Sequence, residues 1–213
     1  MKQEKLLGFY DYTVVLTYCG MIFAFFGILM SINTRFFEAL ICLLGAGVCD
    51  MFDGAVASTK MRTAEEKRFG IQIDSLSDLI SFGVMPSIFV YMISECNPKV
   101  GFICAFYTLA SLIRLSYFNV MEEIRQQETD ERRESFTGLP VTSIALFLPF
   151  VYSFETKFNL YSAAPYMFLL ALCGIGFVSC IELKKPHGIG KVALIAIGII
   201  EILTLLMVAR GAM

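Results

Sequence analysis

The 213-residue sequence has no tryptophan and a single histidine, His187. One histidine argues against a histidine-based metal cluster or catalytic triad on this chain. Charged residues make up only 17% of the sequence, whereas hydrophobic residues make up 57%. A soluble domain needs more surface charge, so this composition predicts an integral membrane protein. No basic patch is interleaved with aromatic residues, which argues against a nucleic-acid partner.

Cysteine occurs seven times, an odd number, and never as C-x-x-C. Cysteines scattered through apolar runs are interpreted as reduced small hydrophobic residues, not as a disulfide framework or a zinc site. The first apolar run follows a short charged stretch, as a cleaved signal peptide would. It is too long for a signal sequence, lacks a small-x-small cleavage site and is followed at once by another run, so we interpret it as a membrane helix.

Apolar runs of about 18 residues or more are long enough to cross a bilayer. Seven are present, although the fifth is the shortest and the third contains aspartates, so that six to eight spans are compatible with the pattern. The sequence therefore predicts an all-α, polytopic bundle of about seven transmembrane helices that forms one domain over residues 1–213. The runs lie near 13–32, 36–56, 72–94, 100–119, 139–155, 162–182 and 191–209.

The loops between these runs differ sharply in basic residues. With the N-terminus placed inside, thirteen Lys and Arg residues fall on one side of the membrane and four on the other. Basic loops face the cytoplasm. We therefore expect a multi-pass protein of the cell (plasma) membrane whose loop 58–69 is cytoplasmic.

The polar residues of the stretch 49–87 stand at the ends of two apolar runs. Asp50 and Asp53 are three residues apart, and Asp74 and Asp78 are four apart, so each pair shares one face of a helix. Carboxylates in a membrane are costly unless they are paired, protonated or bound to cations. Four hard oxygen donors suit Mg²⁺ or Mn²⁺, and two such ions about 3.5–4 Å apart can clamp a phosphoryl group. The stretch predicts two-metal chemistry on a phosphate ester at the lipid surface.

Written as a pattern, Asp50 to Asp78 reads D-x-x-D-G-x-x-A, a loop, then G-x-x-x-D-x-x-x-D. This resembles the signature of the CDP-alcohol phosphotransferase (CDP-alcohol phosphatidyltransferase) family, membrane enzymes that move a phosphoalcohol from a CDP-linked donor to a hydroxyl and release CMP. The segments DSLSDLISFGVMPS, RLSYFNV and FTGLP resemble the phosphatidylserine synthase branch. The similar segments cover about half of the chain.

The resemblance implies a role for each matching residue. Asp50, Asp53 and Asp74 would be metal ligands, and Asp78 would be both a ligand and the base that deprotonates the acceptor hydroxyl. The CDP-diacylglycerol donor would contact residues at the helix ends and in the loop between them, namely Gly54, Ala57 and Gly70, with Thr17 and Thr63 as weaker candidates. A basic group would hold the carboxylate of serine, and the candidates are Arg114, Arg132 and Arg133.

One position departs from the family pattern. Ser58 stands where the family usually has an arginine, and the loop that follows is about three residues longer than usual. Either Lys60 or Arg62 supplies the missing positive charge, or the affinity for the donor is reduced.

The resemblance implies an enzyme, expected as a homodimer, that transfers a phosphatidyl group from CDP-diacylglycerol to L-serine among membrane lipids and releases CMP. The same chemistry with another polar alcohol, such as glycerol phosphate or inositol phosphate, is an alternative. A cation transporter is a second alternative, because intramembrane acids can bind ions in transit. Against it, all four aspartates lie near one membrane face and no inverted repeat is visible.

Overall fold

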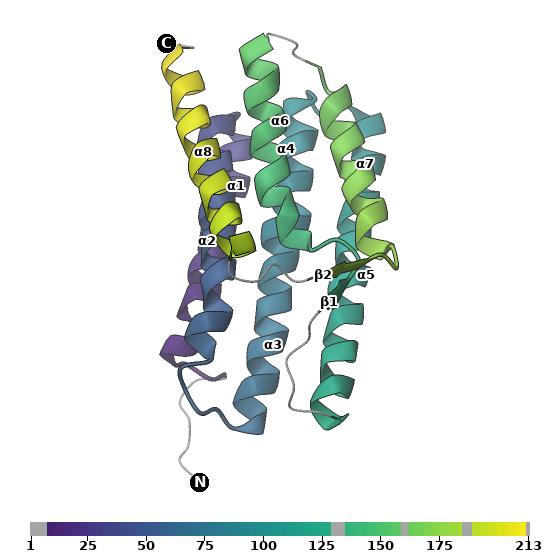
Figure 1. Ribbon diagram of the computed structural model, residues 1–213. Coiled ribbons are helices and arrows are strands. Elements are labelled where there is room, and N and C mark those ends of the chain that lie inside the picture. Colours follow the sequence, from purple (N-terminus) through teal and green to yellow (C-terminus); the bar gives the residue numbers. More distant parts are fainter. Residues whose placement is uncertain (1–7, 129–134, 159–161, 185–188, 212–213) are drawn as a thin grey trace.

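The computed structural model describes residues 8–128, 135–158, 162–184 and 189–211. Figure 1 shows its helices standing side by side as an upright bundle. Each of the seven apolar runs coincides with a helical rod, which confirms the helical architecture expected from the sequence. The rods are α1 (Val15–Ile32), α2 (Phe36–Ala57), α3 with α4 (Ala64–Asp78 and Met85–Ile93), α5 (Pro98–Glu128), α6 (Ile144–Phe158), α7 (Ala164–Val178) and α8 (Ile189–Gly211).

Four helical stretches are long and apolar enough to cross a bilayer, and shorter apolar helices lie at Ala164–Val178 and Ala196–Met207. The protein is therefore a polytopic membrane protein. The fifteen residues of α6 or α7 rise only about 22 Å, less than the roughly 30 Å of a hydrocarbon core. Seven complete spans thus remain a prediction. The four long stretches are Tyr12–Ile32, Phe36–Ala57, Ala64–Ile93 and Pro98–Arg125.

A small antiparallel sheet, which the sequence did not lead us to expect, pairs β1 (Ser135–Thr137) with β2 (Glu182–Lys184). Gly138 follows β1 with a φ of +76°, and its N–H donates to the Ile181 carbonyl at 2.8 Å. A Cβ at this position would lie 2.9 Å from the Phe177 carbonyl oxygen, so only glycine fits. The turn ties the chain entering α6 to the end of α7.

A π-helical turn, Leu79–Val84, joins α3 to α4 directly after Asp78. Pro86 has no N–H, so it cannot donate to the Phe82 carbonyl four residues earlier. The hydroxyl of Tyr107 on α5 donates to that carbonyl at 2.6 Å, and Tyr107 is fully buried. The backbone group freed by the proline therefore finds a partner on the neighbouring helix, as a membrane interior requires.

The apolar core packs around α4, between α2, α5, α6 and α7. The Phe89 ring lies 5.3 Å from that of Phe36 and 6.4 Å from that of Tyr166, measured between centroids. α3 stands outside this core, and Figure 1 shows it extending below α4 beside the lower half of α5. The only buried residues of α3 are Ser75 and Ser77. The helix that carries two of the aspartates is therefore held partly by polar contacts, together with the Phe69 ring, which lies 5.5 Å from that of Phe9.

Candidate active site

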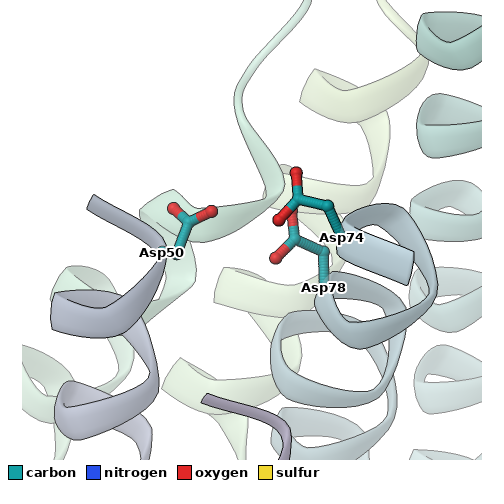
Figure 2. Close-up of side chains that lie close together, drawn as sticks. All are labelled: Asp50, Asp74 and Asp78. Carbon is teal, nitrogen blue, oxygen red and sulfur yellow. The ribbon is translucent and has the colours of Figure 1, made fainter. Parts of the chain in front are cut away.

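Three of the four aspartates converge between α2 and α3. Asp50, Asp74 and Asp78 each place a carboxylate oxygen within 4.8 Å of the others. Figure 2 shows Asp50 on α2 facing the other two across the gap between the helices. The spacing of four residues places Asp74 and Asp78 one turn apart on the same face of α3. The structure thus assembles the predicted pairs into one cluster from two helices.

Asp53 lies beside this cluster and not within it. It lines the same small cavity, where it accepts a hydrogen bond from the Thr17 hydroxyl of α1 at 3.4 Å. Thr17 is buried and lines this cavity, and its contact with the donor remains a prediction. The cavity is closed by residues of three helices and the π-helical turn, namely Leu16, Thr17, Gly20, Ala46, Asp50, Asp53, Asp74, Ser77, Asp78, Ser81 and Phe82.

The carboxylate oxygens of this cluster are suitable ligands for a divalent cation. Among the described residues, the buried Oδ1 of Asp74 has no hydrogen-bond partner. A buried carboxylate oxygen without a partner is costly, and a bound cation would remove that cost. The oxygens are hard ligands of the kind that Mg²⁺ and Mn²⁺ prefer, and they come from carboxylates close enough to share an ion. Asp50, Asp74 and Asp78 would hold the metal, with Asp53 next to them.

Lys60, one of the two candidates for the charge missing at Ser58, is already paired. Its ammonium group lies 2.7 Å from Asp11 and 3.1 Å from Glu66. The hydrogen bond from Lys60 holds the pKa of Asp11 at about 2, and the same bond raises the pKa of Lys60. Ser58 itself is the C-cap of α2, and its hydroxyl donates to the Ala55 carbonyl at 2.7 Å. Lys60 therefore fastens the segment before α1 to the start of α3.

Arg62, the second candidate, has no ion-pair or hydrogen-bond partner in the described part of the chain. Its guanidinium lies over Gly70, where an added Cβ would come within 2.9 Å of Nη1. Gly70 precedes Asp74 by one helical turn, so this cation stands on the approach to the carboxylate cluster. Thr63 caps α3 by accepting from the Glu66 N–H at 3.2 Å, which gives it a structural role.

Gly54 and Ala57 lie on the last turn of α2, beyond the cluster. An added Cβ on Gly54 would meet no atom within 4 Å, so a ligand can approach the backbone there. This leaves room for the donor contact that the family pattern implies for the two residues, which remains a prediction.

Arg114 is buried on α5 and points its guanidinium into protein. Its Nε donates to the Leu139 carbonyl at 3.1 Å, and the group lies 5.6 Å from the centroid of the Phe118 ring. These contacts anchor the chain that leads into α6. Binding of serine by Arg114 remains a prediction, and Arg132 and Arg133 lie outside the described residues.

Sequence reasoning missed several residues of the site. Gly20 and Ala46 line the cavity because α1 and α2 pack closely there, with an added Cβ on Gly20 only 3.3 Å from the Cβ of Cys49. Ser77 and Ser81 line it from the other side. Their hydroxyls beside Asp74 and Asp78 were a visible signal, but which of them face the cavity depends on the packing of the helices.

A family model described as CDP-alcohol phosphatidyltransferase matches residues 12–178, which include every helix that builds the site. The chain belongs to the CDP-alcohol phosphatidyltransferase family. A relative from Methanothermobacter thermautotrophicus named archaetidylserine synthase is 30% identical over 191 residues, 89% of this chain and 76% of the relative. A CDP-diacylglycerol–serine O-phosphatidyltransferase from Bacillus subtilis is 28% identical over 140 residues, 65% of this chain and 68% of the relative.

Because the chain belongs to this family, it is an enzyme, and the alternative of a cation transporter is rejected. The cluster of Asp50, Asp74 and Asp78 is consistent with the metal that such an enzyme uses. The remaining questions are the alcohol that accepts the group, the lipid that is transferred, and the residues that bind each.

Proposed function

We propose that this enzyme is a CDP-diacylglycerol–serine O-phosphatidyltransferase whose site faces the cytoplasm. The observation that carries the chemistry is the convergence of Asp50, Asp74 and Asp78, with the Arg62 guanidinium over Gly70, one helical turn before Asp74. The choice of serine is supported by the two relatives described above, whose names both contain that acceptor. The cytoplasmic side is supported by the excess of basic residues in the loops on that side.

The reaction joins the serine hydroxyl oxygen to the phosphorus that carries diacylglycerol. The bond from that phosphorus to the CMP oxygen breaks, CMP leaves with the bonding electrons, and Asp78 takes the hydroxyl proton. Mg²⁺ or Mn²⁺, when bound, would neutralise charge on the phosphoryl oxygens. Asp50, Asp74 and Asp78 would hold that cation, with Asp53 next to them, while Arg62 binds a donor phosphate in place of the arginine that Ser58 replaces. The protein works as a homodimer.

A second candidate differs only in the lipid. The relative from Methanothermobacter thermautotrophicus is named for an archaetidyl group, so an ether-linked CDP-activated lipid is a donor worth comparing.

A panel assay tests both choices. Purified enzyme receives CDP-diacylglycerol or CDP-activated archaeol with serine, glycerol phosphate or inositol phosphate in the presence of Mn²⁺. With CDP-diacylglycerol and serine we expect one CMP and one phosphatidylserine per turnover, and with the other alcohols we expect no product. Product with another alcohol and none with serine would reject the proposed acceptor.

Two matched variants test the site in the same assay. Asp78→Asn should lower kcat by at least about 10²-fold because the base is lost. Glu38→Gln, an acid on α2 paired with Arg35 at 2.6 Å far along the helix from Asp50, should leave turnover unchanged. Turnover by Asp78→Asn equal to that of the unaltered enzyme would remove the base assignment.

A further inference from the structure

The two buried residues of α3, Ser75 and Ser77, flank its carboxylate face. At about 100° per residue, Asp74 and Asp78 point about 40° apart. Ser75 then lies about 80° to one side of their mean direction and Ser77 about 80° to the other. Each serine faces a different neighbouring helix.

Both serines form hydrogen bonds with a neighbouring helix. The Ser75 hydroxyl donates to Oδ1 of Asn119 on α5 at 2.6 Å, and the amide of Asn119 reaches Gln72 at 3.4 Å. On the other flank the Ser77 hydroxyl donates to the Thr17 carbonyl of α1 at 3.3 Å. Together the two bonds oppose rotation of α3 in either direction.

Rotation matters because metal coordination tolerates little error. A carboxylate about 5 Å from the helix axis moves by about 2 Å when the helix turns by about 20°. Distances from oxygen to Mg²⁺ are confined to within about 0.2 Å. No buried apolar side chain on α3 opposes such a turn, because the rest of the helix is exposed or half-buried.

We propose that Asn119, acting through Ser75, is a positioning residue of the metal site. It fixes the rotation of α3 that aims Asp74 and Asp78 at Asp50. This inference rests on the metal site of the proposed function, but it concerns metal affinity and not the identity of the acceptor.

Mn²⁺ binding to the purified enzyme without substrates, measured by electron paramagnetic resonance, tests the inference. Ser75→Ala and Asn119→Ala should each raise the Kd for Mn²⁺ about fivefold, as expected for one lost hydrogen bond. The double variant should lose no more than Asn119→Ala alone, because Asn119→Ala already removes the bond with Ser75 together with the contact with Gln72. Ser75→Thr keeps the hydroxyl and should stay within about twofold of the unaltered enzyme.

The matched control is Ser31→Ala. Ser31 is buried like Ser75, but its hydroxyl donates to the Gly27 carbonyl at 2.8 Å within α1, so Mn²⁺ affinity should not change. In turnover assays, the Mn²⁺ concentration for half-maximal rate should rise in Ser75→Ala, while kcat at saturating Mn²⁺ stays within about twofold. If Asn119→Ala does not fold, Asn119→Gln, which displaces the amide by one methylene, replaces it with the same expected loss.

Unchanged Mn²⁺ affinity in Ser75→Ala and in the Asn119 variant would overturn the positioning role and leave the proposed function standing. Additive losses in the double variant would also overturn it, since the residues would then act independently. No Mn²⁺ binding by the unaltered enzyme would overturn the metal site and the positioning role together.

Discussion

Replacing Asp50 with asparagine should stabilise the metal-free enzyme and abolish its stabilisation by metal. Two unit charges 4.8 Å apart repel by about 3.5 kcal/mol at an effective dielectric constant of about 20. Asp50 faces both Asp74 and Asp78 within that distance. The side chains can move apart in the metal-free enzyme and so relieve part of the repulsion, and we therefore expect Asp50→Asn to add on the order of 1 kcal/mol without metal, or about 2–4 °C in Tm.

Added metal should reverse the order of stability. A cation at 100 times its Kd stabilises the folded enzyme by about 2.7 kcal/mol, or several degrees in Tm. The unaltered enzyme should gain this shift with Mn²⁺, whereas Asp50→Asn, lacking one of three ligands, should gain almost none. Thermal unfolding in detergent, with EDTA and then with Mn²⁺, measures both effects. Glu38→Gln should behave like the unaltered enzyme.

A lower Tm for Asp50→Asn in EDTA would show that the three carboxylates do not repel one another in the metal-free state. An equal Mn²⁺ shift in the variant and the unaltered enzyme would show that Asp50 is not a ligand. Either result would refute the reasoning, because the first concerns the charges and the second the coordination.

Three further predictions concern the loop and the π-helical turn. Arg62→Ala should raise KM for CDP-diacylglycerol about 10-fold or more, as expected for the loss of one charge-assisted hydrogen bond. Lys60→Ala should change this KM less than about threefold. Equal effects of the two variants in steady-state assays would contradict the assignment of Arg62. The pKa of Asp11 is lowered to about 2, so the Asp11–Lys60 pair should stabilise the fold fully above about pH 4 and lose this effect as the pH falls through about 2. In acid unfolding, Asp11→Asn should therefore lose less free energy of unfolding over that pH interval than the unaltered enzyme does. Tyr107→Phe leaves the Phe82 carbonyl without its partner and should lower the free energy of unfolding by about 1–3 kcal/mol in a denaturant titration; no change would mean that the carbonyl finds another donor.

Local periodicity was enough to predict the helices and the faces of the aspartate pairs, because side chains three or four residues apart share a helix face. It could not show which contacts each aspartate makes. Asp50 and Asp53 point about 60° apart on α2. The packing of α1 against α2 brings the Thr17 hydroxyl to Asp53, whereas Asp50 forms a cluster with Asp74 and Asp78.

The choice between Lys60 and Arg62 was also beyond the sequence. Asp11 lies 49 residues before Lys60, so the ion pair that engages Lys60 depends on the fold of the whole N-terminal half. The pairing of β1 with β2 is another long-range contact, between strands of only three residues that carry almost no local signal. The positions of short polar segments depend on long-range contacts, whereas a long apolar helix can be predicted from its own sequence.

The π-helical turn explains how the continuous helical stretch of α3 and α4 contributes to both the site and the apolar core. Ser75 on α3 and Ser87 on α4 both face α5, where the Ser87 hydroxyl lies 2.8 Å from that of Thr108. In an unbroken α-helix, twelve residues would leave the two serines about 120° apart. A π-helical turn takes about one extra residue, which removes about 100° of that difference. The turn after Asp78 therefore lets α4 pack against α5 in the core while α3 keeps its carboxylates aimed at α2, and Pro86 and Tyr107 hold the turn in place.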